Sequence, residues 1–230
     1  MFTTHLQSRR TDPPPLPRPR KALRSPHREI AFRKEYIAAS QTRLILKPQG
    51  DAKSAVSLKI LDDEDDSVKF TVTGRKHTDR SCREFRDASG LPLFEIHQKA
   101  LFTHSWFVTL PGSDEASIAK AAPRFSFKHG IDDFSLSFKN QAAMDVKECA
   151  EERVELNMER CGTVLALYDV VDGDRKVAVV RESIEHNEIL PFMNSRWRKR
   201  QSVLDITVTP GTDISLVRHP CMQVLSILMG

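Results

Sequence analysis

Five consecutive residues near the end of the chain form the best candidate binding site: Arg196, Trp197, Arg198, Lys199 and Arg200. Four cations in five residues can hold several phosphate oxygens, and each arginine can do so through two parallel hydrogen bonds. The tryptophan can insert at a membrane interface or stack on a nucleic-acid base. The cluster therefore predicts a ligand-binding site for an anionic headgroup. A nuclear-import signal, a nucleic-acid patch and a solvated basic loop are the alternatives.

Motifs of the common enzyme classes are absent. The sequence holds no GxGxxG or GxxxxGK[ST] loop, no GxSxG elbow and no HExxH pair. Neither the eight histidines nor the four cysteines show metal-ligand spacing. The pair Asp132–Asp133 fits a turn, and the acidic run 62–66 lacks the alternating ligands and central glycine of a calcium loop. We therefore expect a non-enzymatic protein with no catalytic residue, no metal and no cofactor.

The positive charge is concentrated at the N-terminus. Residues 1–47 contain 11 Lys/Arg and 3 Asp/Glu, a net charge of +8, so the remainder carries −4 of the total of +4. No apolar signal segment opens the chain, and the cysteines form no disulfide framework. These features favour an intracellular protein, cytoplasmic or nuclear, that binds at the periphery of a membrane if it binds lipid.

Residues 1–34 are predicted to be a disordered, basic, proline-rich tail. Five prolines lie between Pro13 and Pro19, a composition that favours extended polyproline II and cannot bury a core. Residues 14–17 would suit a proline-recognition partner of the WW or SH3 type, whereas the alternative is a solubilising tail.

Residues 35–230 are predicted to be one domain, rich in β-strands. Short apolar or alternating segments follow one another, separated by turn signals such as Asp87–Gly90 and Asp172-Gly173-Asp174. The predicted strands are 42–47, 55–61, 68–73, 81–86, 91–97, 104–110, 117–128, 134–139, 153–158, 163–168, 176–181 and 203–209. About twelve short strands with regular turns favour a closed antiparallel barrel, which leaves no strand edge exposed.

Two segments interrupt the strands. Residues 140–151 contain helix formers at helical spacing and predict a short surface helix. Residues 182–201 carry an apolar group, 189–193, before the basic cluster, and a loop of this length is typical of a functional lid or a disordered insertion.

The apolar run 214–229 is expected to be a helix in the centre of the barrel. It is too short for a membrane span and contains Arg218, His219 and Pro220, so the helix is predicted to begin near Pro220 or to bend there. Its apolar residues lie on every face, which is typical of a buried helix. Asp213 is expected to cap its start.

These segments, taken in order, resemble the LURP-one-related family of tubby C-terminal-like proteins. The resemblance rests on residues 44–47, 87–94, 104–106, 177–179 and 208–213. It implies a twelve-stranded antiparallel barrel around a hydrophobic C-terminal helix. The wider superfamily includes phosphoinositide binders and scramblase-like membrane proteins, and many LURP-one-related members have no established biochemical function.

Two hypotheses follow from these observations. The first is a monomeric binding module whose basic loop and tail recognise phosphoinositide or another anionic phospholipid, with nucleic acid a less favoured ligand. The alternative is a protein-interaction adaptor acting through the proline-rich tail and the loop 182–201.

Overall fold

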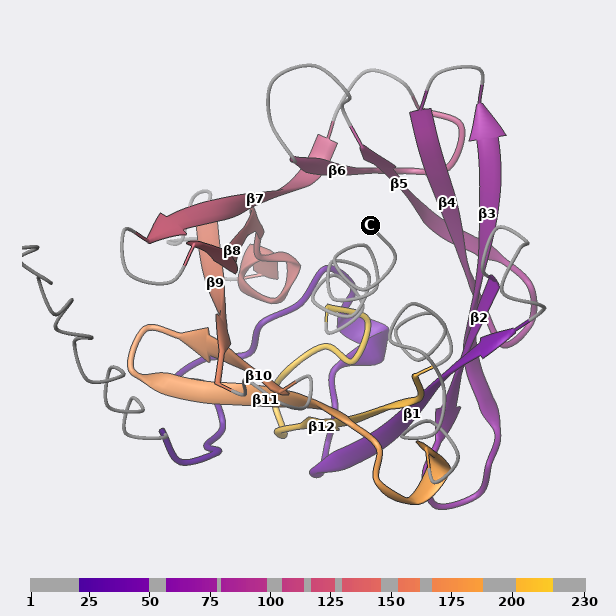
Figure 1. The fold of residues 1–230 in the computed structure, drawn as a ribbon. Coiled ribbons are helices and arrows are strands. Elements are labelled where there is room, and N and C mark those ends of the chain that lie inside the picture. The colour runs from indigo at the N-terminus through magenta and orange to yellow at the C-terminus, as the bar shows by residue number, and fades with distance from the viewer. Residues whose placement is uncertain are drawn as a thin grey trace, which may run out of the picture.

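The computed structural model describes residues 21–49, 57–77, 80–98, 105–113, 117–126, 130–145, 153–161, 167–187 and 202–216. Its main feature is a closed barrel of twelve antiparallel strands (Figure 1). The strands are β1 (Thr42–Gln49), β2 (Ser57–Asp62), β3 (Val68–His77), β4 (Arg80–Asp87), β5 (Pro92–Gln98), β6 (Trp106–Thr109), β7 (Ser117–Ser126), β8 (Gly130–Lys139), β9 (Arg153–Arg160), β10 (Leu167–Asp172), β11 (Arg175–Glu182) and β12 (Leu204–Val208).

Each strand pairs with its neighbours in sequence, and β1 closes the barrel by pairing with β12. Thr42 lies opposite Val208 at this seam. The prediction of a closed twelve-stranded antiparallel barrel is therefore confirmed. The tenth strand is predicted at 163–168, whereas β10 is Leu167–Asp172. It extends further toward the C-terminus than predicted, since it continues up to the Gly173–Asp174 turn.

Apolar strand residues build the core of the barrel, and in β9 and β12 they alternate with more exposed residues. In β9, for example, the buried positions are Val154, Leu156 and Met158. The largest fully buried side chains are Tyr168, Phe70, Phe85, Phe94, Phe138, Ile30, Leu44, Leu46, Leu58, Ile60 and Leu93. Burial of one such aliphatic or aromatic side chain stabilises the fold by about 1.5–3 kcal/mol.

Residues 21–38 form an arm that belongs to the folded body. Leu23 forms a parallel bridge with Lys176 of β11, and Ile30 forms one with Thr212. Ile30 and Ala31 are fully buried, so the part of the predicted disordered tail that covers residues 21–34 is corrected. In Figure 1 the indigo arm runs along β11 and then passes within the ring of strands to the short 3-10 helix η1 (Lys34–Tyr36).

Two further 3-10 helices lie in the described connections: η2 (Gln141–Asp145) and η3 (Glu185–Asn187). The helix η2 begins at the start of the helix predicted over 140–151, whose later residues, 146–151, lie outside the described residues. Asp132 and Asp133 lie within β8, so the turn predicted for them is wrong.

The predicted central helix lies almost wholly outside the described residues, which end at Leu216. The described ranges contain 3-10 helices and no α-helix, so the central helix stays a prediction. Leu216 itself is buried in the barrel core. Within the described residues, no helix is long and apolar enough to cross a membrane.

Candidate functional site

A pocket of about 570 Å³ opens at one end of the barrel. Five neighbouring strands, β5 to β9, place residues around it, because the starts of β5, β7 and β9 meet the ends of β6 and β8 in an antiparallel sheet. The arm and η2 complete its wall. The lining residues are Phe32, Arg33, Phe94, Leu110, Ser117, Ile118, Lys139, Gln141 and Arg153.

The floor of the pocket is aromatic. The Phe32 ring lies 6.2 Å from the Phe94 ring and 4.5 Å from the Phe138 ring, centroid to centroid. Phe94 stacks in turn on Phe85 at 5.1 Å. All four rings are buried, whereas Leu110 at the pocket is 48% exposed. Phe32 and Phe94 therefore form the aromatic floor of the pocket, Phe138 and Phe85 pack against them, and Leu110 is the accessible apolar neighbour.

Three cationic side chains lie around this floor: Arg33, Lys139 and Arg153. Arg33 donates to the Leu93 carbonyl at 3.3 Å and pairs with Glu35 at 3.2 Å. The Arg153 Nε–H donates to the Ser137 hydroxyl at 3.1 Å, which leaves its two terminal nitrogens for other partners. None of the described residues that line the pocket is acidic. The pocket therefore combines apolar contact with the capacity to bind an anion.

The buried amide of Asn140 holds the arm against this end of the barrel. Its Oδ1 accepts the backbone N–H of Ala31 at 2.9 Å, and its Nδ2 donates to the Glu29 carbonyl at 2.9 Å. The Gln141 backbone N–H donates to the Ala31 carbonyl at 2.8 Å. These bonds fix the two arm residues of the pocket, Phe32 and Arg33, against η2.

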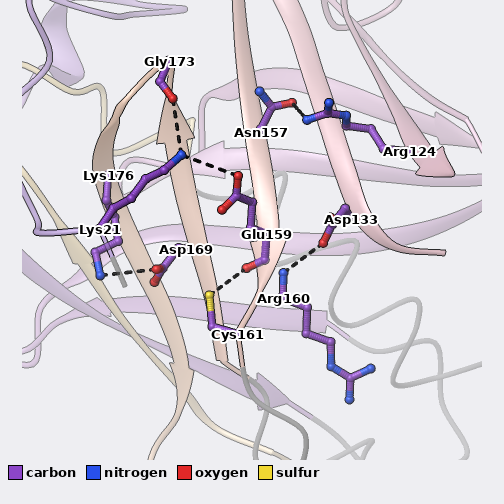
Figure 2. A network of polar contacts seen from close by, with 10 residues as sticks. All are labelled: Lys21, Arg124, Asp133, Asn157, Glu159, Arg160, Cys161, Asp169, Gly173 and Lys176. Atoms are coloured by element: carbon purple, nitrogen blue, oxygen red, sulfur yellow. Dashed lines mark hydrogen bonds and ion pairs between the residues drawn. The ribbon is translucent and has the colours of Figure 1, made fainter. Parts of the chain in front are cut away.

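Figure 2 shows a polar network on β7 to β11, part of which attaches the beginning of the arm. Lys21 lies 3.6 Å from the Glu159 carboxylate and donates to the Gly173 carbonyl at 3.4 Å. The buried Lys176 and Asp169 pair at 3.4 Å. Since these charges are matched within the network, it serves to position the arm.

The predicted site, Arg196 to Arg200, lies outside the described residues. Its flanking strands β11 and β12 are paired from Glu182 and Leu204, at the barrel end opposite to the pocket.

The acidic run 62–66 is the turn between β2 and β3, where Asp62 accepts the Glu64 N–H and pairs with Lys69. Sequence reasoning missed the three cations of the pocket. Lys139 and Arg153 lie at strand ends, and Arg33 follows the apolar residues 30–32. These positions are visible in the sequence, but only closure of the barrel brings the three side chains together.

Comparisons with known proteins agree on the fold. The X-ray structure of a protein from Arabidopsis thaliana matches with a TM-score of 0.52 and 14% sequence identity, over 84% of this chain and 94% of that one. Identity this low shows a shared fold alone. The sequence matches no curated protein. A family model described as LURP-one-related matches residues 42–220, from the first residue of β1 to beyond the end of β12. Because this match spans every strand of the barrel, the chain belongs to the LURP-one-related family.

Proposed function

We propose that this protein is a non-enzymatic binding module that recognises anionic phospholipid headgroups and acts at the periphery of a membrane. The observation that supports it most is the pocket in which Arg33, Lys139 and Arg153 surround an aromatic floor. Its volume of about 570 Å³ is within the range of small-molecule sites, roughly 300–1,000 Å³.

The pocket suits a ligand with a charged end and an apolar end. Arg153 and Lys139 are exposed and can donate charge-assisted hydrogen bonds to phosphate oxygens. Leu110 and the phenylalanine floor offer contact to the glycerol and first methylene groups of a lipid.

Positive charge elsewhere in the sequence would add to the general attraction between the protein and an anionic membrane. The tail and the 196–200 cluster are basic, and a cation near an anionic leaflet contributes about 1 kcal/mol at physiological salt. The cytoplasmic leaflet carries most anionic lipid, which is consistent with the expected intracellular location.

Vesicle flotation tests the proposal. The full chain is mixed with phosphatidylcholine vesicles, with the same vesicles containing phosphatidylserine, and with vesicles containing a phosphoinositide. Losing two cations should weaken binding of the double variant Lys139→Ser/Arg153→Ser to anionic vesicles by about 30-fold, at about 1 kcal/mol each. Binding should also weaken as salt is raised.

The matched control removes two exposed cations away from the pocket, Lys59→Ser/Arg181→Ser. This control loses the same net charge as the pocket variant. It therefore distinguishes binding in the pocket from general electrostatic attraction to the vesicle. A third variant replaces the cations at 196, 198, 199 and 200 by alanine. Equal binding by the pocket variant and the control would contradict the pocket, and loss only in the third variant would move the site to the loop.

The adaptor alternative retains one supporting observation. Ile184 is 78% exposed and lies at the start of the 182–201 segment, beside η3. An exposed isoleucine offers an apolar contact for a protein partner. Pull-downs with Ile184→Ser, and with residues 1–20 deleted, test this alternative, and an unchanged set of partners in both would contradict it.

A further inference from the structure

Three potential metal ligands meet on β4 and β5, away from the pocket. Cys82 lies directly opposite His97 in the strand register, and Glu95 precedes His97 by two residues. Because side chains alternate along a strand, Glu95 and His97 lie on the same face of β5, opposite to the core residue Ile96. A sulfur, a carboxylate oxygen and an imidazole nitrogen of these residues lie within 4.8 Å of one another.

We propose that Cys82, Glu95 and His97 form a binding site for a zinc-like divalent cation. Thiolate, imidazole and carboxylate are the ligands that Zn²⁺ takes in proteins, at about 2.0–2.3 Å. In a tetrahedral site such bonds place the ligand atoms about 3.3–3.8 Å apart. Side-chain rotations therefore suffice to close the observed arrangement around an ion.

The charges of this set balance those of the cation. On binding, the Cys82 thiol releases its proton and the thiolate forms the metal–sulfur bond. With the Glu95 carboxylate, the protein supplies two negative charges to a dication, while the imidazole is neutral. This neutrality matters because Cys82 is only 2% exposed, and the side chains of Glu95 and His97 are 15% and 20% exposed.

The surroundings of His97 already restrict its ring. Its Nε2 lies 3.3 Å from the Glu95 carboxylate and 3.1 Å from the Thr109 hydroxyl on β6. A ring nitrogen that binds a metal uses its lone pair and carries no proton, so coordination through Nε2 would exchange the Thr109 contact for the metal–nitrogen bond. Three protein ligands leave a fourth position for water, and the partial exposure of Glu95 and His97 gives the ion a route from solvent.

Metal titration of the full chain tests the site. After removal of metal with a chelator, Zn²⁺ is titrated calorimetrically, and Co²⁺ is used as a spectroscopic probe. We expect one ion per chain at this site, a sulfur-to-cobalt charge-transfer band, and a rise in Tm on adding Zn²⁺.

Cys82→Ser and His97→Ala should each abolish the charge-transfer band and the rise in Tm. The matched control is Cys161→Ser, since Cys161 is an exposed cysteine outside the cluster. Glu95→Gln is a milder variant that conserves the size of the side chain. If its circular dichroism spectrum equals that of the wild type, a loss of metal binding reflects the lost carboxylate ligand and not misfolding. The proposal is overturned if the wild type binds no Zn²⁺, or if Cys82→Ser retains the charge-transfer band.

Discussion

The carboxylate of Asp213 accepts the backbone N–H of Phe32, 181 residues earlier in the sequence, at 3.0 Å. The same oxygen accepts the Arg33 N–H at 3.0 Å, and the other oxygen accepts the Ser215 N–H at 2.6 Å. Asp213 has no solvent exposure. One buried carboxylate therefore joins the arm to the chain that leaves β12, and it places Phe32 and Arg33 at the pocket.

Replacing Asp213 by alanine should destabilise the protein strongly. Three buried or half-buried N–H groups would lose their acceptor, at about 1–3 kcal/mol each, so we expect a loss of at least about 3 kcal/mol. Denaturant unfolding measures it. Ser215→Ala is the control, because the Ser215 hydroxyl is buried without a hydrogen bond among the described residues, and its removal should cost little. Similar losses in both variants would show that Asp213 has no special role.

Truncation of the N-terminus should show where the folded body begins. Deleting residues 1–20 should leave Tm unchanged, whereas deleting residues 1–33 removes Ile30 and Phe32 from the core. Ile30→Ala and Phe32→Ala should each cost about 2–5 kcal/mol in the free energy of unfolding. Thermal and denaturant unfolding of the four variants distinguishes a packed arm from a loosely attached one. Normal stability after deletion of residues 1–33 would contradict the arm's packing.

The strand order could be predicted because alternation and turn residues are local signals. Asp87 to Gly90 forms the β4–β5 turn, with Gly90 at φ 87°, as its composition indicates. The arm was not predictable in this way. Apart from Ala38, its buried residues form one short run, Ile30-Ala31-Phe32, within a proline- and arginine-rich segment without periodicity. The pocket and the Cys82–His97 pair depend on strand register and barrel closure, which no spacing in the sequence shows.

The buried pair of Lys176 and Asp169 should be costly to break and inexpensive to replace. Their charged atoms lie 3.4 Å apart, with side chains 10% and 4% exposed, beneath the bridge that Leu23 forms with β11. Lys176→Met leaves an uncompensated carboxylate and should cost about 3–5 kcal/mol. The double variant Lys176→Met/Asp169→Leu should be close to the wild type. A double-mutant cycle by denaturant unfolding measures the coupling, and additive losses would contradict it.

The Asp87 carboxylate should make the stability of the β4–β5 turn depend on pH. It accepts the Ser89 hydroxyl at 2.6 Å and the backbone N–H groups of Ser89 and Leu91 at 2.9 Å each. The bond from the Ser89 side chain is the main cause that lowers the pKa of Asp87 below 3.8, with the backbone bonds adding to it. A depressed carboxylate pKa means that the ionised form is stabilised by folding. Its contribution is complete above the unfolded pKa and is lost as pH falls through the folded one.

The difference in unfolding free energy between the wild type and Asp87→Asn should therefore become smaller in acid. At neutral pH we expect the variant to be less stable by about 1 kcal/mol, since the turn is partly exposed and solvent screens the charge. Below about pH 4 the wild type loses this advantage and the two unfolding curves should converge. Asp63→Asn, an exposed carboxylate in the β2–β3 turn, controls for the general effect of removing one negative charge. A constant difference between wild type and Asp87→Asn from pH 7 to pH 2 would show that the side-chain hydrogen bonds, rather than the charge, stabilise this turn.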